Sequence, residues 1–320
     1  MKKRLFTGIQ SSGTLHIGNY FGALKPFAEM AEDYDSMLMI ADYHALTSLR
    51  DPEAMRTNII NTTKDYLAVG INPSAVTIFK QSDVHEHTEL GWIFDCLVTV
   101  PFLQQAHAYK DKVAKGLEAN AGLFTYPMLM AADILLYDTD IVPVGADQRQ
   151  HVEYAREAAT KFNIAFGGKS DSASGDVFKE PQERIMESIA TVPGTDGKKM
   201  SKSYGNTIPL FGTKDEIAKA VMGIVTDSTG DRPENVFAIH QLFRDEDDLA
   251  KLYQEHIGKY KNLKEALIED IDTLIAPMRE VRDQISDADV RTVLEEGAVR
   301  ARAQASAKMQ DVRAKVGVSL

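Results

Sequence analysis

The stretch Arg4-Leu5-Phe6-Thr7-Gly8-Ile9-Gln10-Ser11-Ser12-Gly13-Thr14-Leu15-His16-Ile17-Gly18-Asn19 decides the fold of this 320-residue chain. Residues 4–9 predict a short buried strand, and residues 10–13 predict a loop. From His16 to about Ala31, apolar residues recur at helical spacing and predict a helix. A strand, a glycine-containing loop and a helix form the opening of a nucleotide-binding α/β unit.

The same stretch has the chemistry of an anion site. Gly8 and Gly13 let the backbone approach a ligand closely. A helix beginning near His16 offers free N–H groups and the positive end of its dipole, which favour a phosphate. The ring of His16 can donate to a phosphate oxygen, Gly18 leaves a flat floor for a purine, and Asn19 adds a neutral donor. Taken alone, the stretch fits an ordinary strand-turn-helix with a surface histidine equally well.

The rest of the first two thirds alternates strands with helices. Further strands are predicted over residues 36–41, 75–80 and 141–144, and helices over 52–69 with Asp51 as N-cap, 88–98, 127–136 and from about 148. This alternation predicts an α/β fold with a mostly parallel, doubly wound, Rossmann-like sheet. Ligands of such sheets bind where strands deliver their carboxyl ends. That rule places residues 10–13, 41–44 and 145–147 around one crevice.

After residue 205 the pattern becomes helical, with helices predicted over 214–224, 245–257, 262–286 and 290–316. We therefore divide the chain into a Rossmann-like catalytic domain over residues 1–205 and a helical domain over residues 206–290. A C-terminal helix follows over residues 291–320. The sequence leaves open whether this last helix packs back on the first domain.

Composition narrows the class of protein. The net charge of −11 argues against a general nucleic-acid coat protein, although it is compatible with an enzyme that binds RNA through a local basic patch. The single cysteine, Cys96, excludes an intrachain disulfide and a cysteine-based metal cluster. Apolar runs such as residues 128–137 are too short to span a bilayer, and no signal-peptide core follows the first basic residues. We expect a cytoplasmic protein without a membrane segment.

The only local histidine cluster is Asp83-Val84-His85-Glu86-His87. On a strand, alternation would put Asp83, His85 and His87 on one face. No partner ligands stand nearby in the sequence, so we favour a solvated loop over a metal site.

A second motif with chemical meaning is Lys199-Met200-Ser201-Lys202-Ser203, preceded by Gly194-Thr195-Asp196-Gly197-Lys198. Glycine and aspartate make the approach a loop rather than a helix. Lys199 and Lys202 can neutralise charge that builds on the β- and γ-phosphates as pyrophosphate leaves, an effect worth roughly 3 kcal/mol per donor. A loop that makes such contacts only in the transition state raises turnover. Considered alone, a solvated basic loop is the simpler interpretation.

Together the two motifs resemble the signature pair of class I aminoacyl-tRNA synthetases. Residues 16–19 are similar to the HIGH motif, with Asn19 in place of the last histidine, and residues 199–203 match the KMSKS motif in full. The resemblance to tryptophanyl-tRNA synthetases is closer still; it covers residues 4–205 and is carried by residues 8–23, 125–137, 141–148 and 184–186. Ser11 stands where that family usually has proline, so this turn lacks proline's fixed φ. Tyrosyl-tRNA synthetases share the fold and both signatures and are the nearest alternative.

Asp133 can be interpreted from its own surroundings. It is a carboxylate in an apolar helix, and burying it is costly unless it is hydrogen-bonded. An indole N–H is a donor that needs an acceptor when buried. A solvent-facing aspartate is an equal alternative from the residues alone, and the resemblance favours the ligand role. Such a site rejects phenylalanine by ~10⁴ or more because the acceptor would be left unpaired. Tyrosine could pair with Asp133 but would fill an indole-shaped pocket poorly.

The resemblance also implies the remaining roles. Tyr126 and Gln148 would contact the amino group of the substrate, Gly145 and Asp147 the ATP ribose, and Ile185 the adenine. For Phe6 and His44, a place on the pocket wall and plain core packing are equal alternatives. The implied catalytic residues are Lys199, Lys202, Ser201 and His16; the ATP-binding residues are Gln10, Ser11, Ser12, His16, Gly18, Asn19, Gly145, Ala146, Asp147, Ile185, Lys199, Met200, Ser201, Lys202 and Ser203; and the tryptophan-binding residues are Asp133, Tyr126, Gln148, Met130, His44 and Phe6.

The implied reaction uses ATP and Mg²⁺, without metal-binding side chains, to form tryptophanyl-adenylate and pyrophosphate from L-tryptophan. The tryptophanyl group then passes to the 3′ end of tRNA(Trp), with the helical domain at the anticodon, and the family implies a homodimer. Three alternatives stay open. They are tyrosine as the substrate, a nucleotidyltransferase without tRNA, and a non-catalytic RNA-binding relative.

Overall fold

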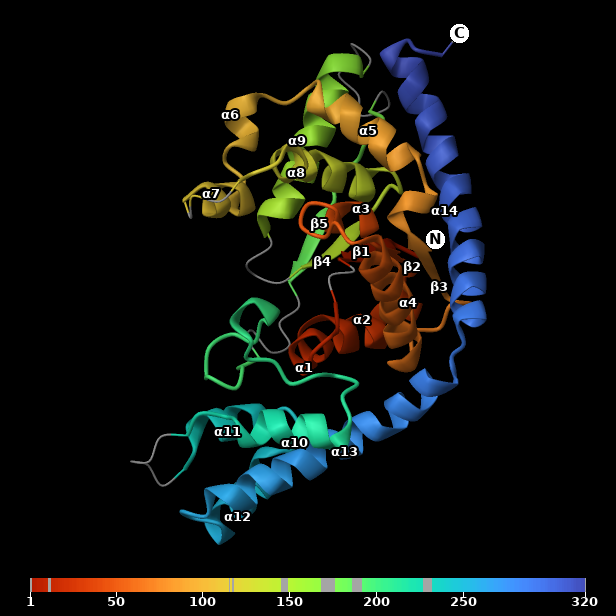
Figure 1. Cartoon of the computed structure of the whole chain (residues 1–320). Coiled ribbons are helices and arrows are strands. Elements are labelled where there is room, and N and C mark those ends of the chain that lie inside the picture. Colours follow the sequence, from red (N-terminus) through yellow and green to blue (C-terminus); the bar gives the residue numbers. More distant parts are fainter. Residues whose placement is uncertain are drawn as a thin grey trace.

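A five-stranded parallel sheet in the order β3-β2-β1-β4-β5 forms the centre of the fold (Figure 1). The computed structural model describes residues 2–10, 13–114, 116, 118–144, 149–167, 176–185, 192–226 and 232–319. The chain builds outward from β1 to β3, then returns to the other side of β1, so the predicted doubly wound sheet is confirmed. The strands are β1 (Arg4–Ile9), β2 (Asp35–Ile40), β3 (Val76–Lys80), β4 (Ile141–Val144) and β5 (Gln182–Ile185).

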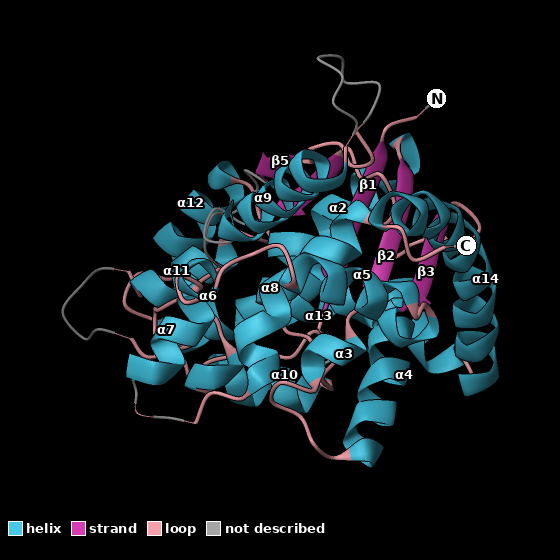
Figure 2. Cartoon of the chain, turned by 90° about the horizontal axis from the view of Figure 1, so that it is seen from above, coloured by secondary structure: helices cyan, strands magenta, loops and turns pink. Residues whose placement is uncertain are grey.

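Helices join the strands and cover both faces of the sheet, as the view from above shows (Figure 2). Side chains alternate between the faces along each strand. Leu5 and Leu38 enter one core with helix α4, whereas Phe6 and Met39 enter another with α5, α8 and α9. The helices of this part are α1 (Ile17–Asn19), α2 (Lys25–Met30), α3 (Asp42–Ala45), α4 (Pro52–Ala68), α5 (Glu86–Asp95), α6 (Val100–Leu103), α7 (His107–Ala114), α8 (Ala121–Leu135) and α9 (Arg149–Phe166).

Two helices differ from the expected pattern for local reasons. The helix expected from His16 to Ala31 contains a π-helical turn over Tyr20–Leu24 between α1 and α2. Pro26 follows that turn and has no N–H to donate to the preceding turn, which disfavours a regular α-helix there. Helix α8 begins at Ala121 rather than near Pro127, because Asn120 caps it by accepting from Leu123 N at 2.8 Å.

Strand β5 and helices α6 and α7 were not expected. The sequence of β5, Gln-Glu-Arg-Ile, lacks the apolar run of a buried strand, because β5 lies at the edge of the sheet and pairs only with β4. The expected N-cap of α4 is confirmed, since Asp51 Oδ1 accepts from Glu53 N at 2.9 Å and from Ala54 N at 3.2 Å.

The C-terminal third is helical, as predicted, with α11 as an addition that was not expected. Helix α13 packs against α4 and α10, and Arg282 on α13 donates to Asp65 on α4 at 2.5 Å. None of the helices in the described residues is long and apolar enough to cross a bilayer. The helices are α10 (Lys214–Met222), α11 (Glu234–His240), α12 (Glu246–Glu255), α13 (Tyr260–Gln284) and α14 (Asp287–Val316).

Helix α14 packs back on the first part of the chain, which the sequence had left open. It lies along β3, the other edge strand of the sheet, in both views (Figures 1 and 2). Arg300 of α14 donates to Pro73 O at 3.1 Å and to Thr77 Oγ1 at 3.3 Å. A helix over an edge strand shields the strand from pairing with other chains.

Gly297 permits this close packing, and its replacement tests it. A Cβ at position 297 would lie 1.7 Å from the backbone oxygen of Ile78. We expect Gly297→Ala to lower the free energy of unfolding by about 1–3 kcal/mol through overpacking, although alanine is the better helix former. Gly22→Ala is the matched control, because nothing lies within 4 Å of its Cβ position. Denaturant titration measures both, and equal stability of Gly297→Ala and the wild type would contradict this packing account.

Candidate active site

The two sequence motifs lie side by side in the fold. The segment that follows the lysine motif pairs with the residues that open α1: Ile17 N donates to Ile208 O at 3.0 Å, and Leu210 N donates to Leu15 O at 3.0 Å. These bonds hold the segment that follows residues 199–203 against the start of α1.

Two glycines bring the motifs into close approach. A Cβ at Gly18 would lie 3.3 Å from Met200 Cβ, and one at Gly13 would lie 3.8 Å from Lys202 Nζ. Gly13 has φ +105°, a backbone conformation that favours glycine. Met200 is buried in the core below, so its side chain anchors the lysine motif against α1.

The lysine motif is clamped by Asn206, a residue that the sequence analysis did not single out. Asn206 Oδ1 accepts from Ser201 N at 2.8 Å, and Asn206 Nδ2 donates to Lys199 O at 3.1 Å and to Asp196 Oδ1 at 2.6 Å. One buried amide thereby joins the turn before the motif to the motif itself. The backbone of Lys199 and of Ser201 is thereby held in place.

The positive charge of Lys202 interacts with Asp65 on α4, and Asp65 is itself paired with Arg282 on α13. Burial lowers the pKa of Lys202, and the negative charge of Asp65 opposes that shift. Burial raises the pKa of Asp65, and the Arg282 guanidinium opposes that shift in turn. A polyanion placed beside Lys202 would favour its charged form, so the arrangement suits phosphate binding.

His16 is neutral in this environment. Burial, reinforced by the positive charge of Lys202, lowers the pKa of His16 to about 4. A neutral imidazole can still donate from one ring nitrogen. Asn19 Oδ1 accepts from His16 N at 3.0 Å and so caps α1. This contact explains why asparagine suits position 19, while its predicted contact with ATP stays a prediction.

The shift at His16 predicts a pH dependence of stability. Between about pH 6.5 and pH 4 the unfolded chain binds a proton at His16 and the folded chain does not, so acid favours unfolding in this window. We expect His16→Gln to lose less stability than the wild type between pH 7 and pH 5. Denaturant titration at both pH values measures the loss of stability in each protein. The two proteins share every other titrating group, so the difference between their losses reports on His16 alone. Equal losses in the two proteins would contradict the assignment.

A cavity of about 480 Å³ opens at the carboxyl ends of β1 and β2. Its walls come from those strands and from α3, α8 and β4. Gln10, at the end of β1, also lines it and donates to His44 O at 3.0 Å. Every described residue expected to bind tryptophan lies on this cavity, namely Phe6, His44, Tyr126, Met130 and Asp133. For Phe6 and His44, the structure thus favours a place on the pocket wall.

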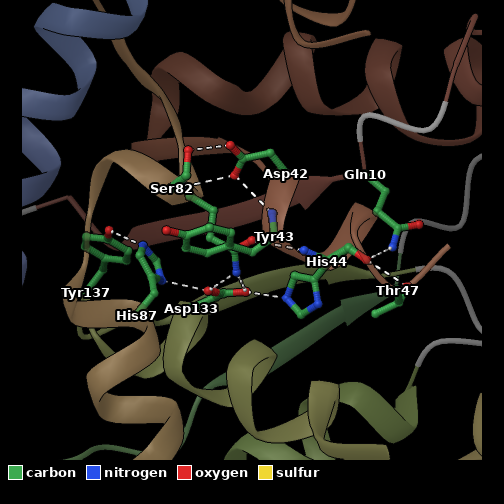
Figure 3. A network of polar contacts seen from close by, with 10 residues as sticks. Gln10, Asp42, Tyr43, His44, Thr47, Ser82, His87, Asp133 and Tyr137 are labelled. Carbon is green, nitrogen blue, oxygen red and sulfur yellow. Dashed lines mark hydrogen bonds and ion pairs between the residues drawn. The ribbon is translucent and has the colours of Figure 1, made fainter. Parts of the chain in front are cut away.

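Asp133 is ionised at the base of this cavity although it is only 1% exposed. Gln81 Nε2 donates to Oδ1 at 2.8 Å and to Oδ2 at 3.0 Å. His44 Nε2 lies 2.7 Å from Oδ2 (Figure 3). His87 Nδ1 approaches Oδ1 to 2.6 Å, a close contact that is poorly aligned for a hydrogen bond and is therefore chiefly electrostatic. Burial alone would raise the pKa of Asp133, but His87 and His44 outweigh it and hold the pKa at about 2.

The sequence analysis missed Gln81 and His87, and its interpretation of the histidine cluster was wrong. The segment around His87 is not a solvated loop, because His87 is fully buried in the first turn of α5. Among the described residues, no three His, Cys, Asp or Glu side chains gather as a metal site would require. Because a buried aspartate is costly unless it is hydrogen-bonded, Asp133 itself indicated that partners such as these must exist elsewhere in the sequence.

Several predicted site residues lie outside what the structure describes. Ile185 ends β5, and Ser203 lies in the 3₁₀ turn Lys202–Tyr204; only their backbones are described. Six further predicted site residues lie outside the described ranges, namely Ser11, Ser12, Gly145, Ala146, Asp147 and Gln148.

Residues 1–285 match the model of the family "tRNA synthetases class I (W and Y)", and the chain belongs to this family. Its relatives include the tryptophan–tRNA ligases of Fusobacterium nucleatum, 46% identical over 99% of this chain and 98% of the relative, and of Rhodopirellula baltica, 44% identical over 98% of this chain and 99% of the relative. The structure of tryptophanyl-tRNA synthetase from Campylobacter jejuni, complexed with ADP and tryptophan, is 42% identical. It superposes with a TM-score of 0.90 over 98% of this chain and 99% of that one.

Proposed function

We propose that this chain is a tryptophan–tRNA ligase. It activates L-tryptophan with ATP to tryptophanyl-adenylate and pyrophosphate, then transfers the tryptophanyl group to the 3′ end of tRNA(Trp). The observation that carries this proposal is the ionised Asp133 at the base of an apolar cavity that Gln10, at the start of the loop between β1 and His16, also lines. The tryptophan and ADP held by the similar Campylobacter jejuni enzyme support it.

Tryptophan lies in the cavity with its ring N–H donating to Asp133. Phe6 and Met130 supply apolar walls that suit an indole. Tyr126, which lines the same cavity, and Gln148 bind the substrate's amino group. Because the site provides a buried acceptor for a ring N–H, it rejects phenylalanine, which would leave that acceptor unpaired.

ATP lies between the loop after β1 and the lysine motif. Gly18 provides the flat surface below the adenine, and the neutral His16 ring donates to a phosphate oxygen. Mg²⁺ enters with the substrate on the phosphates, as is common for nucleotide sites. The adenosine is held further by residues on both sides of the crevice, namely Gln10, Ser11, Ser12, Asn19, Gly145, Ala146, Asp147, Ile185, Met200 and Ser203.

The chemical step needs no nucleophile from the protein. The tryptophan carboxylate attacks the α-phosphorus in line, a new C(O)–O–P bond forms, and the bond to pyrophosphate breaks. Lys199, Lys202 and Ser201 neutralise the charge that develops on the leaving group. The enzyme therefore contributes positioning and electrostatic stabilisation.

The remaining parts serve the tRNA. Residues 1–205 form the catalytic domain, residues 206–290 the anticodon-binding domain, and residues 291–320 the C-terminal helix, which packs along β3. The enzyme works as a homodimer in the cytoplasm.

Charging of tRNA tests this function. Purified enzyme with ATP, Mg²⁺ and labelled tryptophan should acylate tRNA(Trp), and tRNA(Tyr) serves as the matched control. Adenylate formation without acylation of either tRNA would instead identify a nucleotidyltransferase, and no reaction with ATP would identify a non-catalytic relative.

A further inference from the structure

The carboxylate of Asp133 is held from behind by two fully buried side chains. Gln81 and His87 are both 0% exposed, and both contact Oδ1, at 2.8 Å and 2.6 Å. A carboxylate oxygen has about two lone pairs. Oδ1 therefore faces two nitrogens of the protein interior, one that donates a hydrogen bond from Gln81 and one that approaches closely from His87.

The second oxygen faces the cavity. Oδ2 lies 2.7 Å from Nε2 of His44, which stands on the cavity wall with 11% of its side chain exposed. Figure 3 shows His44 and His87 on opposite sides of the carboxylate. Gln81 Nε2 also donates to Oδ2, at 3.0 Å, in the longer of its two hydrogen bonds to the carboxylate. Oδ2 is thus the oxygen to which a substrate N–H can donate, beside His44 or in its place.

The orientation of His87 is itself fixed by a further buried residue. The Tyr137 hydroxyl lies 2.8 Å from His87 Nε2. Burial, together with the charges of Asp133 and Glu86, raises the pKa of Tyr137 well above its usual value, so the hydroxyl keeps its proton. When His87 carries its proton on Nδ1, that nitrogen faces Asp133 and Nε2 accepts from the Tyr137 hydroxyl. The ring of Phe79 stacks on His87 at 6.1 Å between centroids.

We propose that His87 is a positioning residue for substrate selection, which turns the Asp133 carboxylate so that Oδ2 accepts a ring N–H. The proposal rests on the tryptophan function proposed above and adds a determinant of its specificity. Without the His87 ring, Oδ1 would lose one of the two nitrogens that face it. The carboxylate could then rotate or bind a proton, and in either state it would distinguish less well between rings with and without an N–H.

The test compares tryptophan with β-(3-benzothienyl)alanine, in which sulfur replaces the ring N–H. The ratio of their kcat/KM values in ATP–pyrophosphate exchange measures how strongly the N–H is selected. We expect His87→Leu to lower this ratio by ~10-fold or more, the effect of weakening one hydrogen bond to a charged group. His87→Asn, whose amide can donate from the position of Nδ1, should retain most of the ratio. His85→Leu, the same change at an exposed histidine nearby, should leave it unchanged.

Two results would overturn the role of His87. One is an unchanged ratio in His87→Leu, and the other is an equal fall in the Leu and Asn variants, which would indicate packing alone. If His87→Leu does not fold, Tyr137→Phe deletes only the hydroxyl behind His87; a smaller fall in the ratio is expected, and no fall counts against the proposal. A wild-type enzyme without tryptophan-dependent exchange would instead overturn the proposed function itself, so the two failures are distinguishable.

Discussion

Replacing Asp133 by alanine is expected to weaken tryptophan binding by about 100-fold, the upper range for loss of a hydrogen bond to a charged group. The carboxylate is the ionised acceptor at the base of the cavity, and it is the proposed partner of the substrate's ring N–H. Fluorescence titration or equilibrium dialysis measures the dissociation constant. The affinity for ATP should change little, since ATP is proposed to bind through the two motifs rather than in this cavity.

The matched control is Asp247→Ala, which removes an exposed carboxylate on α12 far from the cavity. It should bind tryptophan as the wild type does. Circular dichroism of both variants separates loss of the site from loss of the fold, because Asp133→Ala also leaves buried donors without their acceptor. A folded Asp133→Ala variant with an unaltered tryptophan dissociation constant would remove Asp133 from the pocket.

Replacing Lys202 by alanine is expected to slow adenylate formation by about 100-fold with little change in tryptophan affinity. Lys202 approaches the loop after β1 at Gly13, where the phosphates of ATP are proposed to lie. Its positive charge would matter most as charge develops on the leaving pyrophosphate, so its removal lowers kcat more than it weakens binding. Single-turnover adenylate formation at saturating tryptophan and ATP measures the step directly.

Lys198→Ala is the control for this prediction. Lys198 is exposed, is also a lysine, and precedes the motif directly. Its variant should keep wild-type exchange within a small factor. Unchanged ATP–pyrophosphate exchange in Lys202→Ala would overturn the catalytic role of that lysine.

The elements predicted well from the sequence are those whose signal is local. The strand over residues 4–9, the glycine loop and the helix start at His16 follow from apolar runs and turn residues that stand next to one another. Asp133 also stood out locally, as a lone carboxylate in an apolar helix. Strand β5 gave no such signal, since an edge strand with polar residues reads like a loop.

The residues that complete the site could not be found in this way, because they meet only in the folded chain. Gln81 directly follows β3, and His87 lies in the first turn of α5. The carboxylate that they contact, Asp133, belongs to α8. Asn206 lies just past the lysine motif, and the sequence around it gives no sign of the hydrogen bonds that it makes to the motif. The packing of α14 on β3 likewise depends on Gly297, whose missing Cβ has meaning only against the backbone of Ile78.

The most direct test of the account is ATP–pyrophosphate exchange measured separately with each standard amino acid. An ionised acceptor at the base of an apolar cavity, together with two motifs proposed to bind phosphate, predicts exchange that depends on tryptophan. Phenylalanine and tyrosine should support exchange at most weakly, phenylalanine because it leaves Asp133 unpaired and tyrosine because it fills the cavity poorly. Exchange that prefers tyrosine, or that occurs with no amino acid, would contradict the account.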